Sequence, residues 1–372
     1  MRKIFLISIC ATVCLTVLRS NFVAITLATA CLAGYELYLR SIFSSHRIAT
    51  TVSKLKSRLS SLPYSEKEFN QDFKSVMPSQ HLRRTPFARK ANLSSPSINY
   101  KDGLRSTSFV LHSQISGNKV YLFGGSTIEC QEVPDAFTIA SQLQLQLNLA
   151  PPPLNNYEVI NCGVGGATLK ANFNHKKGIY PSKNDICIFY FGVNETEFPN
   201  EIYKNRQTFS SIPNLVRTRD LFLRLEFITL YRILSKFLTF DESHAIFDKS
   251  VRNVEDTLKS IDSECQNSGT HFAAILQPFL HTRVPLTQFD RQNSKYYVNQ
   301  SRFDASLFLY EKFKTRLNRQ KFFFDATSVF NRTNLDVYTD WAHTNYQGNK
   351  IIADYFYSII QQQLLKGQFL ID

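Results

Sequence analysis

The chain has 372 residues, of which 43% are hydrophobic, and it carries a formal net charge of +13. This composition excludes a chain that is disordered throughout, and the length fits two domains or one large α/β domain with extensions. The charge concentrates between Arg40 and Lys119, where 14 Lys and Arg stand against 4 Asp and Glu, a net of +10. A basic stretch beside an apolar N-terminus indicates binding to anionic lipid headgroups. The sequence contains no zinc-finger or RNA-binding motif, so we expect no nucleic-acid partner.

The first 40 residues are apolar and allow three interpretations. The uncharged runs Ile4–Leu18 and Ser20–Tyr35 are separated by Arg19, and each is shorter than the ~20 residues of a membrane span. The segment could be a signal peptide cleaved near Ala28–Ala30, a single anchor helix over Asn21–Leu39, or a pair of short spans. We expect an uncleaved anchor that attaches the protein to a membrane. The side of the membrane stays open, because the basic residues favour the cytoplasmic face whereas the N-terminus looks like an export signal.

The rest of the chain divides into two parts. Residues 41–116 are rich in Pro, Ser and basic residues, which predicts a basic juxtamembrane arm or linker with a short amphipathic helix near 47–61. Residues 117–366 form the predicted folded domain, with a helical insert at about 200–240. The apolar part of the insert, 212–240, is interpreted as a helix pair packed on the core, or as a lid or membrane-facing surface.

The pattern from residue 119 onward is that of an α/β fold. Apolar runs predict strands at 119–125, 157–166, 184–195, 270–280 and 321–330, and helical spacing predicts helices at 136–149, 244–269 and 345–365. Nearly continuous apolar runs suit parallel strands that are covered on both faces. We therefore expect a three-layer α/β/α sandwich with a mainly parallel five-stranded sheet.

Chemically active residues follow the predicted strands. Ser126 comes after the first strand in Gly-Gly-Ser, Gly166 after the second in "GVGG", and Asn194 after the third in "FGVNE". Asp340 and His343 stand in "DWAH" before the last helix. Because ligands bind beyond the carboxyl ends of parallel strands, these residues are expected to converge.

Such a set meets the needs of ester hydrolysis through a serine. Ser126 would be the nucleophile, His343 its base, and Asp340 the carboxylate that orients the base. The N–H groups of Ser126 and Gly166 with the side chain of Asn194 would form an oxyanion hole. This chemistry requires no metal and no cofactor.

These blocks resemble the SGNH (GDSL-like) hydrolase superfamily, named for Ser, Gly, Asn and His in four sequence blocks. The family's conserved positions are matched here by Ser126, Gly166, Asn194 and the pair Asp340 and His343. The resemblance extends over about residues 117–366. The chain departs from the family in having Gly-Gly-Ser for Gly-Asp-Ser, which makes it similar to divergent, GGS-type members. Gly165 could replace Gly166 as the amide donor. The resemblance implies a flavodoxin-like SGNH hydrolase fold.

Each of these residues also has a simpler interpretation. Ser126 or Asp340 could cap a helix, and Asn194 begins a glycosylation acceptor pattern, Asn-Glu-Thr. Cys130 is an alternative nucleophile, although no base is implied for it. Asp325 at the end of a predicted strand is interpreted as a turn residue. The seven cysteines show no metal spacing and are interpreted as buried thiols.

Together with the apolar N-terminus, the resemblance implies a membrane-anchored serine esterase or O-acyltransferase. Its substrate would be an acyl ester, such as an O-acetyl group on an envelope glycan or a lipid ester. The alternative is a catalytically silent scaffold, a membrane-tethered binding or assembly protein. A protein partner and the oligomeric state are left open by the sequence.

Overall fold

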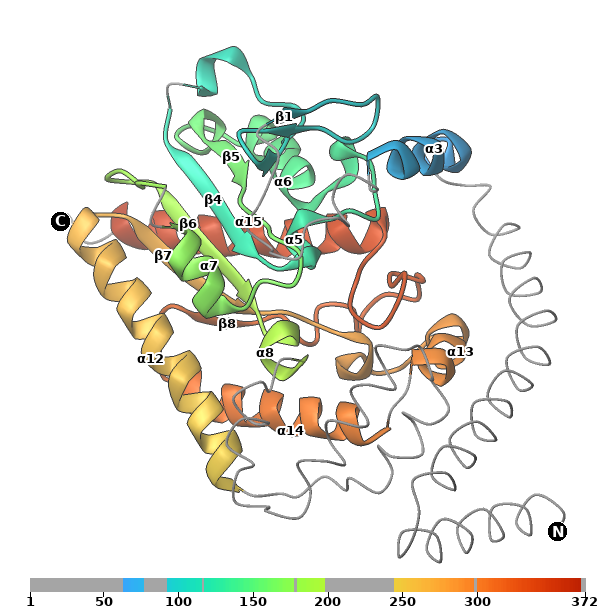
Figure 1. Ribbon diagram of the computed structural model, residues 1–372. Helices are drawn as coiled ribbons and strands as arrows, with labels where there is room; N and C mark the ends of the chain where they lie inside the picture. The colour runs from blue at the N-terminus through green and yellow to red at the C-terminus, as the bar shows by residue number, and fades with distance from the viewer. Residues whose placement is uncertain are drawn as a thin grey trace, which may run out of the picture. The chain divides into compact units, whose positions relative to one another are not determined.

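The computed structural model describes residues 63–76, 92–115, 117–176, 179–197, 244–297 and 300–368 (Figure 1). From Ser65 onward they belong to one compact unit, formed by Ser65–Arg206 and Phe240–Asp372. The predicted segment at 1–40, the helix near 47–61 and the insert at 212–240 lie outside the described residues and stay predictions. Among the helices that the structure describes, none is both long and apolar enough to cross a membrane.

Five parallel strands form the centre of the sheet. They are β4 (Lys119–Gly124), β5 (Glu158–Asn161), β6 (Ile186–Phe191), β7 (His271–Leu276) and β8 (Phe323–Asp325). Their spatial order is β5-β4-β6-β7-β8, with every neighbouring pair parallel. Numbered among themselves, the strands run 2-1-3-4-5, the order of flavodoxin-like folds. All five predicted strands are confirmed, with shorter bounds.

Helices cover both faces of the sheet and complete the three predicted layers (Figure 1). One face carries α6 (Ile139–Leu149) and α15 (Tyr346–Gln368), and the other carries α7 (Leu169–Lys176), α12 (His244–Ser268) and α14 (Gln300–Leu317). Successive residues of β6 alternate between the two cores, with Ile188 in the first and Phe189 in the second. Every residue of β6 is therefore buried, as its continuous apolar run predicts.

The sequence predicts three of these helices, and the structure confirms them as α6, α12 and α15. Gly269, with a φ of +69°, follows α12 in the left-handed conformation that commonly ends a helix. The prediction missed α7 and α14, although parallel strands need a crossover between them. In α14 the signal is Leu309, Phe313 and Leu317, which are spaced by four and fully buried. Helices α3 (Glu66–Val76) and α13 (Gln288–Tyr297) were also not predicted.

Three short antiparallel strands extend the sheet at β5. They are β1 (Asn92–Leu93), β2 (Tyr100–Lys101) and β3 (Leu104–Arg105), and β3 pairs with β5. The sequence assigns this range to the arm or linker at 41–116, whereas residues 92–105 belong to the sheet. Asp102 and Gly103 connect β2 to β3 with φ values of 50° and 78°. A positive φ at both residues of an Asp-Gly pair is typical of a tight β-hairpin turn. This dipeptide is the sequence signal that was overlooked.

Candidate active site

The sheet has a topological switch point at β4, because β5 lies on one side of it and β6 on the other. Ligand sites of such folds form beyond the carboxyl ends of the strands at this point. The chain leaves β4 into the short helix α5 (Ser126–Glu129) and leaves β6 into α8 (Val193–Glu197). Ser126 and Asn194 therefore stand at the two strand ends where the topology predicts a site.

Close packing requires the two glycines before Ser126. A Cβ on Gly124 would come within 2.5 Å of Ile128 Cγ1, and a Cβ on Gly125 would come within 2.1 Å of Asn194 Nδ2. Gly125 occupies the N-cap position of α5, so Ser126 is the first residue of this helix and not its cap. The cap interpretation of Ser126 is therefore wrong, and its hydroxyl makes a different contact.

A chain of two hydrogen bonds joins Ser126, His343 and Asp340. Ser126 Oγ lies 2.7 Å from His343 Nε2, and His343 Nδ1 lies 2.6 Å from Asp340 Oδ2. Residues 217 positions apart in the chain thus meet at one edge of the sheet. In this arrangement an imidazole with its proton on Nδ1 can accept the proton of the serine hydroxyl at Nε2.

The carboxylate of Asp340 also organises its own loop. Its Oδ1 accepts hydrogen bonds from the N–H groups of Ala342 and His343, both at 2.7 Å. The last helix, α15, is capped by Asn345, whose Oδ1 accepts from two N–H groups of its first turn. The interpretation of Asp340 as the cap of this helix is therefore wrong.

The charge of Asp340 suits the role of holding an imidazole. Burial raises the pKa of Asp340, but hydrogen bonds from the side chain and backbone of His343 and the charge of its ring outweigh this effect. The pKa of the carboxyl therefore lies below its ordinary value, and the group is ionised at neutral pH. An ionised carboxylate favours the tautomer of His343 that carries its proton on Nδ1.

Amide donors border the same edge. The N–H of Gly165 donates to Glu129 Oε2 at 2.6 Å, so this group is already engaged. No backbone hydrogen bond from the N–H of Gly166 is found among the described residues, and its φ of +72° is a conformation that favours glycine. Gly166 is thus the better candidate of the two glycines for an oxyanion donor, and this role stays a prediction.

Asn194, which follows β6, contacts the loops that follow β4 and β5. Its Nδ2 donates to Ala167 O at 2.7 Å and packs against Gly125, the residue before Ser126. A glycan attached to Nδ2 would displace both neighbours, so the glycosylation interpretation does not fit this geometry. The predicted residues Ser126, Asp340, His343 and Asn194 are therefore brought to one place.

Two other predicted residues lie apart from this chemistry. Burial raises the pKa of Cys130 to about 12, and its Sγ donates to Thr127 O at 3.0 Å. Its thiol stays protonated, which excludes Cys130 as the nucleophile. Asp325 Oδ1 accepts from the N–H of Thr327 at 2.8 Å, which confirms its interpretation as a turn residue. No group of His, Cys, Asp or Glu among the described residues has an arrangement that could hold a metal.

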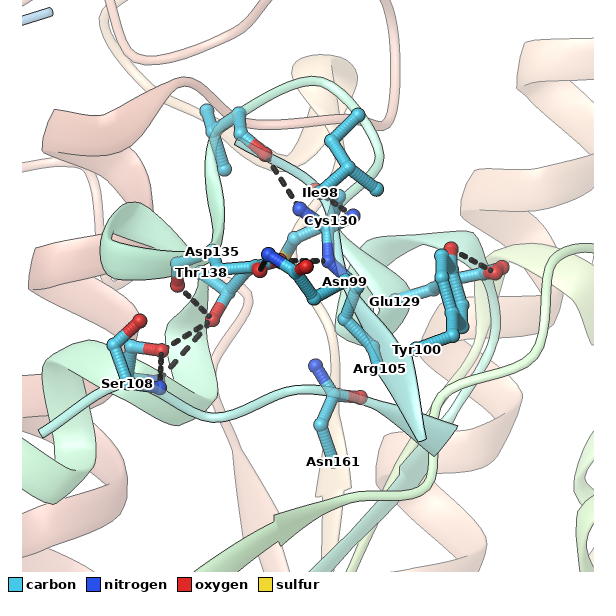
Figure 2. A network of polar contacts seen from close by, with 12 residues as sticks. Ile98, Asn99, Tyr100, Arg105, Ser108, Glu129, Cys130, Asp135, Thr138 and Asn161 are labelled. Atoms are coloured by element: carbon cyan, nitrogen blue, oxygen red, sulfur yellow. Dashed lines mark hydrogen bonds and ion pairs between the residues drawn. The ribbon is translucent and has the colours of Figure 1, made fainter. Parts of the chain in front are cut away.

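Three glutamates next to the site were missed by sequence reasoning. Glu129 accepts a hydrogen bond from Tyr100 Oη at 2.8 Å, which Figure 2 shows, and another from the N–H of Gly165. Glu195 accepts from the N–H groups of Leu169 and Gly192, and burial raises its pKa. Glu132 Oε1 lies 3.6 Å from His343 Nε2. No spacing pattern marks these glutamates, and the only signal was that two of them follow Ser126 closely in the chain.

Comparison with known proteins gives matches among solved structures alone. No protein-family model and no curated protein matches the chain. It is similar to an acetyl xylan esterase, AlAXEase, with 14% identity over 65% of this chain and 98% of that one and a TM-score of 0.35. It is also similar to the acetylxylan esterase Axe2 from Geobacillus stearothermophilus, with 15% identity over 66% of this chain and 94% of that one and a TM-score of 0.36. A member of the lipolytic protein G-D-S-L family from Veillonella parvula has 11% identity over 65% of this chain and 96% of that one, with a TM-score of 0.34.

Proposed function

We propose that this chain is a serine esterase of the SGNH type, with Ser126 as nucleophile, His343 as general base and Asp340 as the residue that orients it. The observation that carries the proposal is the hydrogen-bond chain from Ser126 Oγ through His343 to Asp340, at 2.7 and 2.6 Å. A serine hydroxyl is a weak nucleophile unless an adjacent base takes its proton, and this arrangement supplies the base.

The first half-reaction transfers the acyl group to the enzyme. Ser126 Oγ attacks the acyl carbon while its proton passes to His343 Nε2, and the carbonyl oxygen becomes an oxyanion. When the tetrahedral species collapses, the bond to the alcohol oxygen breaks and the proton on His343 Nε2 passes to that alcohol. The products are a free alcohol and an acyl ester on Ser126.

The second half-reaction reverses these roles with a new acceptor. His343 takes a proton from the acceptor, whose oxygen attacks the acyl carbon, and Ser126 Oγ leaves with that proton. Water as the acceptor gives a carboxylic acid and makes the protein an esterase. A hydroxyl as the acceptor gives a new ester and makes it an O-acyltransferase.

Donors at the edge of the sheet would stabilise the oxyanion. We assign this role to the N–H groups of Ser126 and Gly166 and to Asn194 Nδ2, which lies beside the residue before the nucleophile. Removing one such donor typically costs about 2.7–4 kcal/mol of transition-state stabilisation. The contact between Asn194 and Ala167 links two of these donor loops.

The finer parts of the proposal come from the sequence motifs and the charge distribution. We propose an O-acetyl group on an envelope glycan, or a lipid ester, as the substrate, and attachment to a membrane through residues 1–40. The net charge of +10 between Arg40 and Lys119 supports a position next to anionic lipid headgroups.

The test uses the full chain and a fluorophosphonate probe, which reacts with activated serines. The parent should be labelled, whereas Ser126→Ala and His343→Ala should not. Ser260→Ala is the matched control, since Ser260 lies on the exposed face of α12 and bonds only to the carbonyl of Asp256 among the contacts described. Incubation with acetylated oligosaccharides should then yield acetate or a new acetyl ester.

Two results would contradict the proposal. A folded parent that is neither labelled nor acylated would indicate the silent scaffold instead. Labelling that persists in Ser126→Ala would place the reactive serine elsewhere in the chain.

A further inference from the structure

A second carboxylate approaches the imidazole from the side opposite to Asp340. Glu132 Oε1 lies 3.6 Å from His343 Nε2, the ring nitrogen that also faces Ser126 Oγ. The side chains of Glu132 and His343 are 27% and 22% exposed, so the pair is only partly screened by solvent. The imidazole therefore lies between two acidic residues, one at each ring nitrogen.

The segment that carries Glu132 is anchored from β3. The guanidinium of Arg105 is fully buried and donates to Cys130 O at 3.4 Å and to Val133 O at 2.9 Å, on either side of Glu132. It also forms an ion pair of 2.5 Å with Asp135, which Figure 2 shows beside Cys130. Because Arg105 holds the backbone on both sides of Glu132, the fold fixes the position from which Glu132 approaches His343.

We propose that Glu132 is a specificity-determining residue of this site, which sets the pH at which His343 loses its proton and selects uncharged esters over anionic ones. This inference rests on the function proposed above. An anion beside Nε2 stabilises the protonated imidazole, so a higher pH is needed to obtain the neutral base. The same anion repels a carboxylate or phosphate near the scissile ester.

Acidic groups face the imidazole at both of its nitrogens, and the guanidinium of Arg105, which anchors the segment of Glu132, is paired with Asp135. His343 faces Asp340 on its own loop and Glu132 on the segment after α5. Burial raises the pKa of Glu132, the charge of His343 opposes this, and the charges of Asp340 and Glu129 add to the rise. The ionised form of Glu132 is therefore favoured most when the imidazole carries its proton.

This arrangement narrows the proposed substrate class. An acyl ester on a neutral sugar presents hydroxyl groups, which a carboxylate accepts as hydrogen-bond donors. An ester next to a uronic acid, or next to a lipid phosphate, brings a like charge toward Glu132. We therefore expect O-acylated neutral glycans to be better substrates than acylated anionic glycans or phospholipids.

The experiment compares the full-length parent with Glu132→Gln on two esters of similar shape, phenyl acetate and the anionic 4-acetoxybenzoate. The matched control is Glu158→Gln, which removes the same charge from the start of β5, where Glu158 pairs with Lys119. Glu132→Gln should move the midpoint of the acid limb of kcat/KM down by about one pH unit. It should also reduce the preference for the neutral ester by at least about fivefold. Glu158→Gln should leave both quantities at the parent values.

A readout that does not depend on turnover separates this inference from the proposed function. The ring of His343 can be titrated by NMR in histidine-labelled chain and assigned with His343→Gln. A parent without turnover would overturn the proposed function, and the ring midpoint would still decide the role of Glu132. An unchanged midpoint in Glu132→Gln would overturn the inference. If that variant does not fold, Glu132→Asp should give a smaller shift in the same direction, and an unchanged midpoint there would also overturn it.

Discussion

The contact between Gly125 and Asn194 allows a sharp test of the oxyanion assignment. In Gly125→Ala the added Cβ would lie 2.1 Å from Asn194 Nδ2, whereas real Cβ contacts stay beyond 3.0 Å. The amide therefore has to move by roughly 1 Å, and its 2.7 Å hydrogen bond to Ala167 O is lost with it. Neither Ser126 nor its partners are changed chemically.

The expected fall in kcat follows from what the side-chain amide of Asn194 would contribute as an oxyanion donor. Losing one oxyanion donor costs about 2.7–4 kcal/mol, which corresponds to a fall in kcat of about 10²–10³-fold. Overpacking of the contact should lower the free energy of unfolding by about 1–3 kcal/mol. Gly117→Ala is the matched control, because its Cβ would lie 2.2 Å from Asn156 O near the other end of β4. It should destabilise the fold at least as much, because the blocking atom is backbone, and it should leave kcat at the parent value.

The assay measures kcat on an activated acetyl ester for Gly125→Ala, Asn194→Ala and the double variant. Both single changes act through the same amide, so the double variant should be no slower than the slower single variant. Two results would refute the reasoning. One is a double variant whose loss is the product of the two single losses, and the other is a Gly125→Ala kcat within about threefold of the parent.

Asp340→Asn should lower kcat by about 10³–10⁴-fold, because an amide N–H facing His343 Nδ1 favours the wrong tautomer; steady-state kinetics check this. The lowered pKa of Asp340 stabilises the fold above its ordinary pKa, and this stabilisation is lost as the pH falls through the folded-state pKa. From about pH 6 to about pH 3, the urea midpoint of the parent should therefore fall further than that of Asp340→Asn. Arg105→Ala should lower the free energy of unfolding by about 3–5 kcal/mol, since Asp135 stays buried without its cation. Urea unfolding of Lys312→Ala, at a partly exposed ion pair, should show a change below about 1 kcal/mol.

The central sheet and the meeting of the predicted site residues could be derived from sequence because both follow from local patterns. Continuous apolar runs predict parallel strands, and parallel strands bring the residues that follow them to one edge. Ser126 and Asn194 come directly after such strands, and Asp340 lies three positions from His343. The strand order then decides which of these residues touch, because β4 lies directly beside β6.

The residues that sequence reasoning missed depend on pairings that no local pattern encodes. Arg105 meets Asp135, 30 positions away, because β3 joins the sheet beside β5. The basic, Pro- and Ser-rich composition of residues 41–116 indicated a linker. The Asp102-Gly103 turn is a local signal that this composition, averaged over the whole segment, concealed. The approach of Glu132 to His343 depends in turn on this anchor. Buried polar networks of this kind become visible only after the edges of the sheet are known.

The short strands at the two ends of the described sheet also protect the molecule from aggregation. The central strand β6 is an apolar stretch without charge or Pro, the kind of segment that stacks into fibrils when it is exposed. It is shielded by its neighbours, and the strands at the two margins, β1 and β8, have only two and three residues. Margins this short offer few free backbone groups to another chain. A chain without residues 92–105 would instead present the open margin of β5, and it should self-associate at concentrations where the parent stays dispersed.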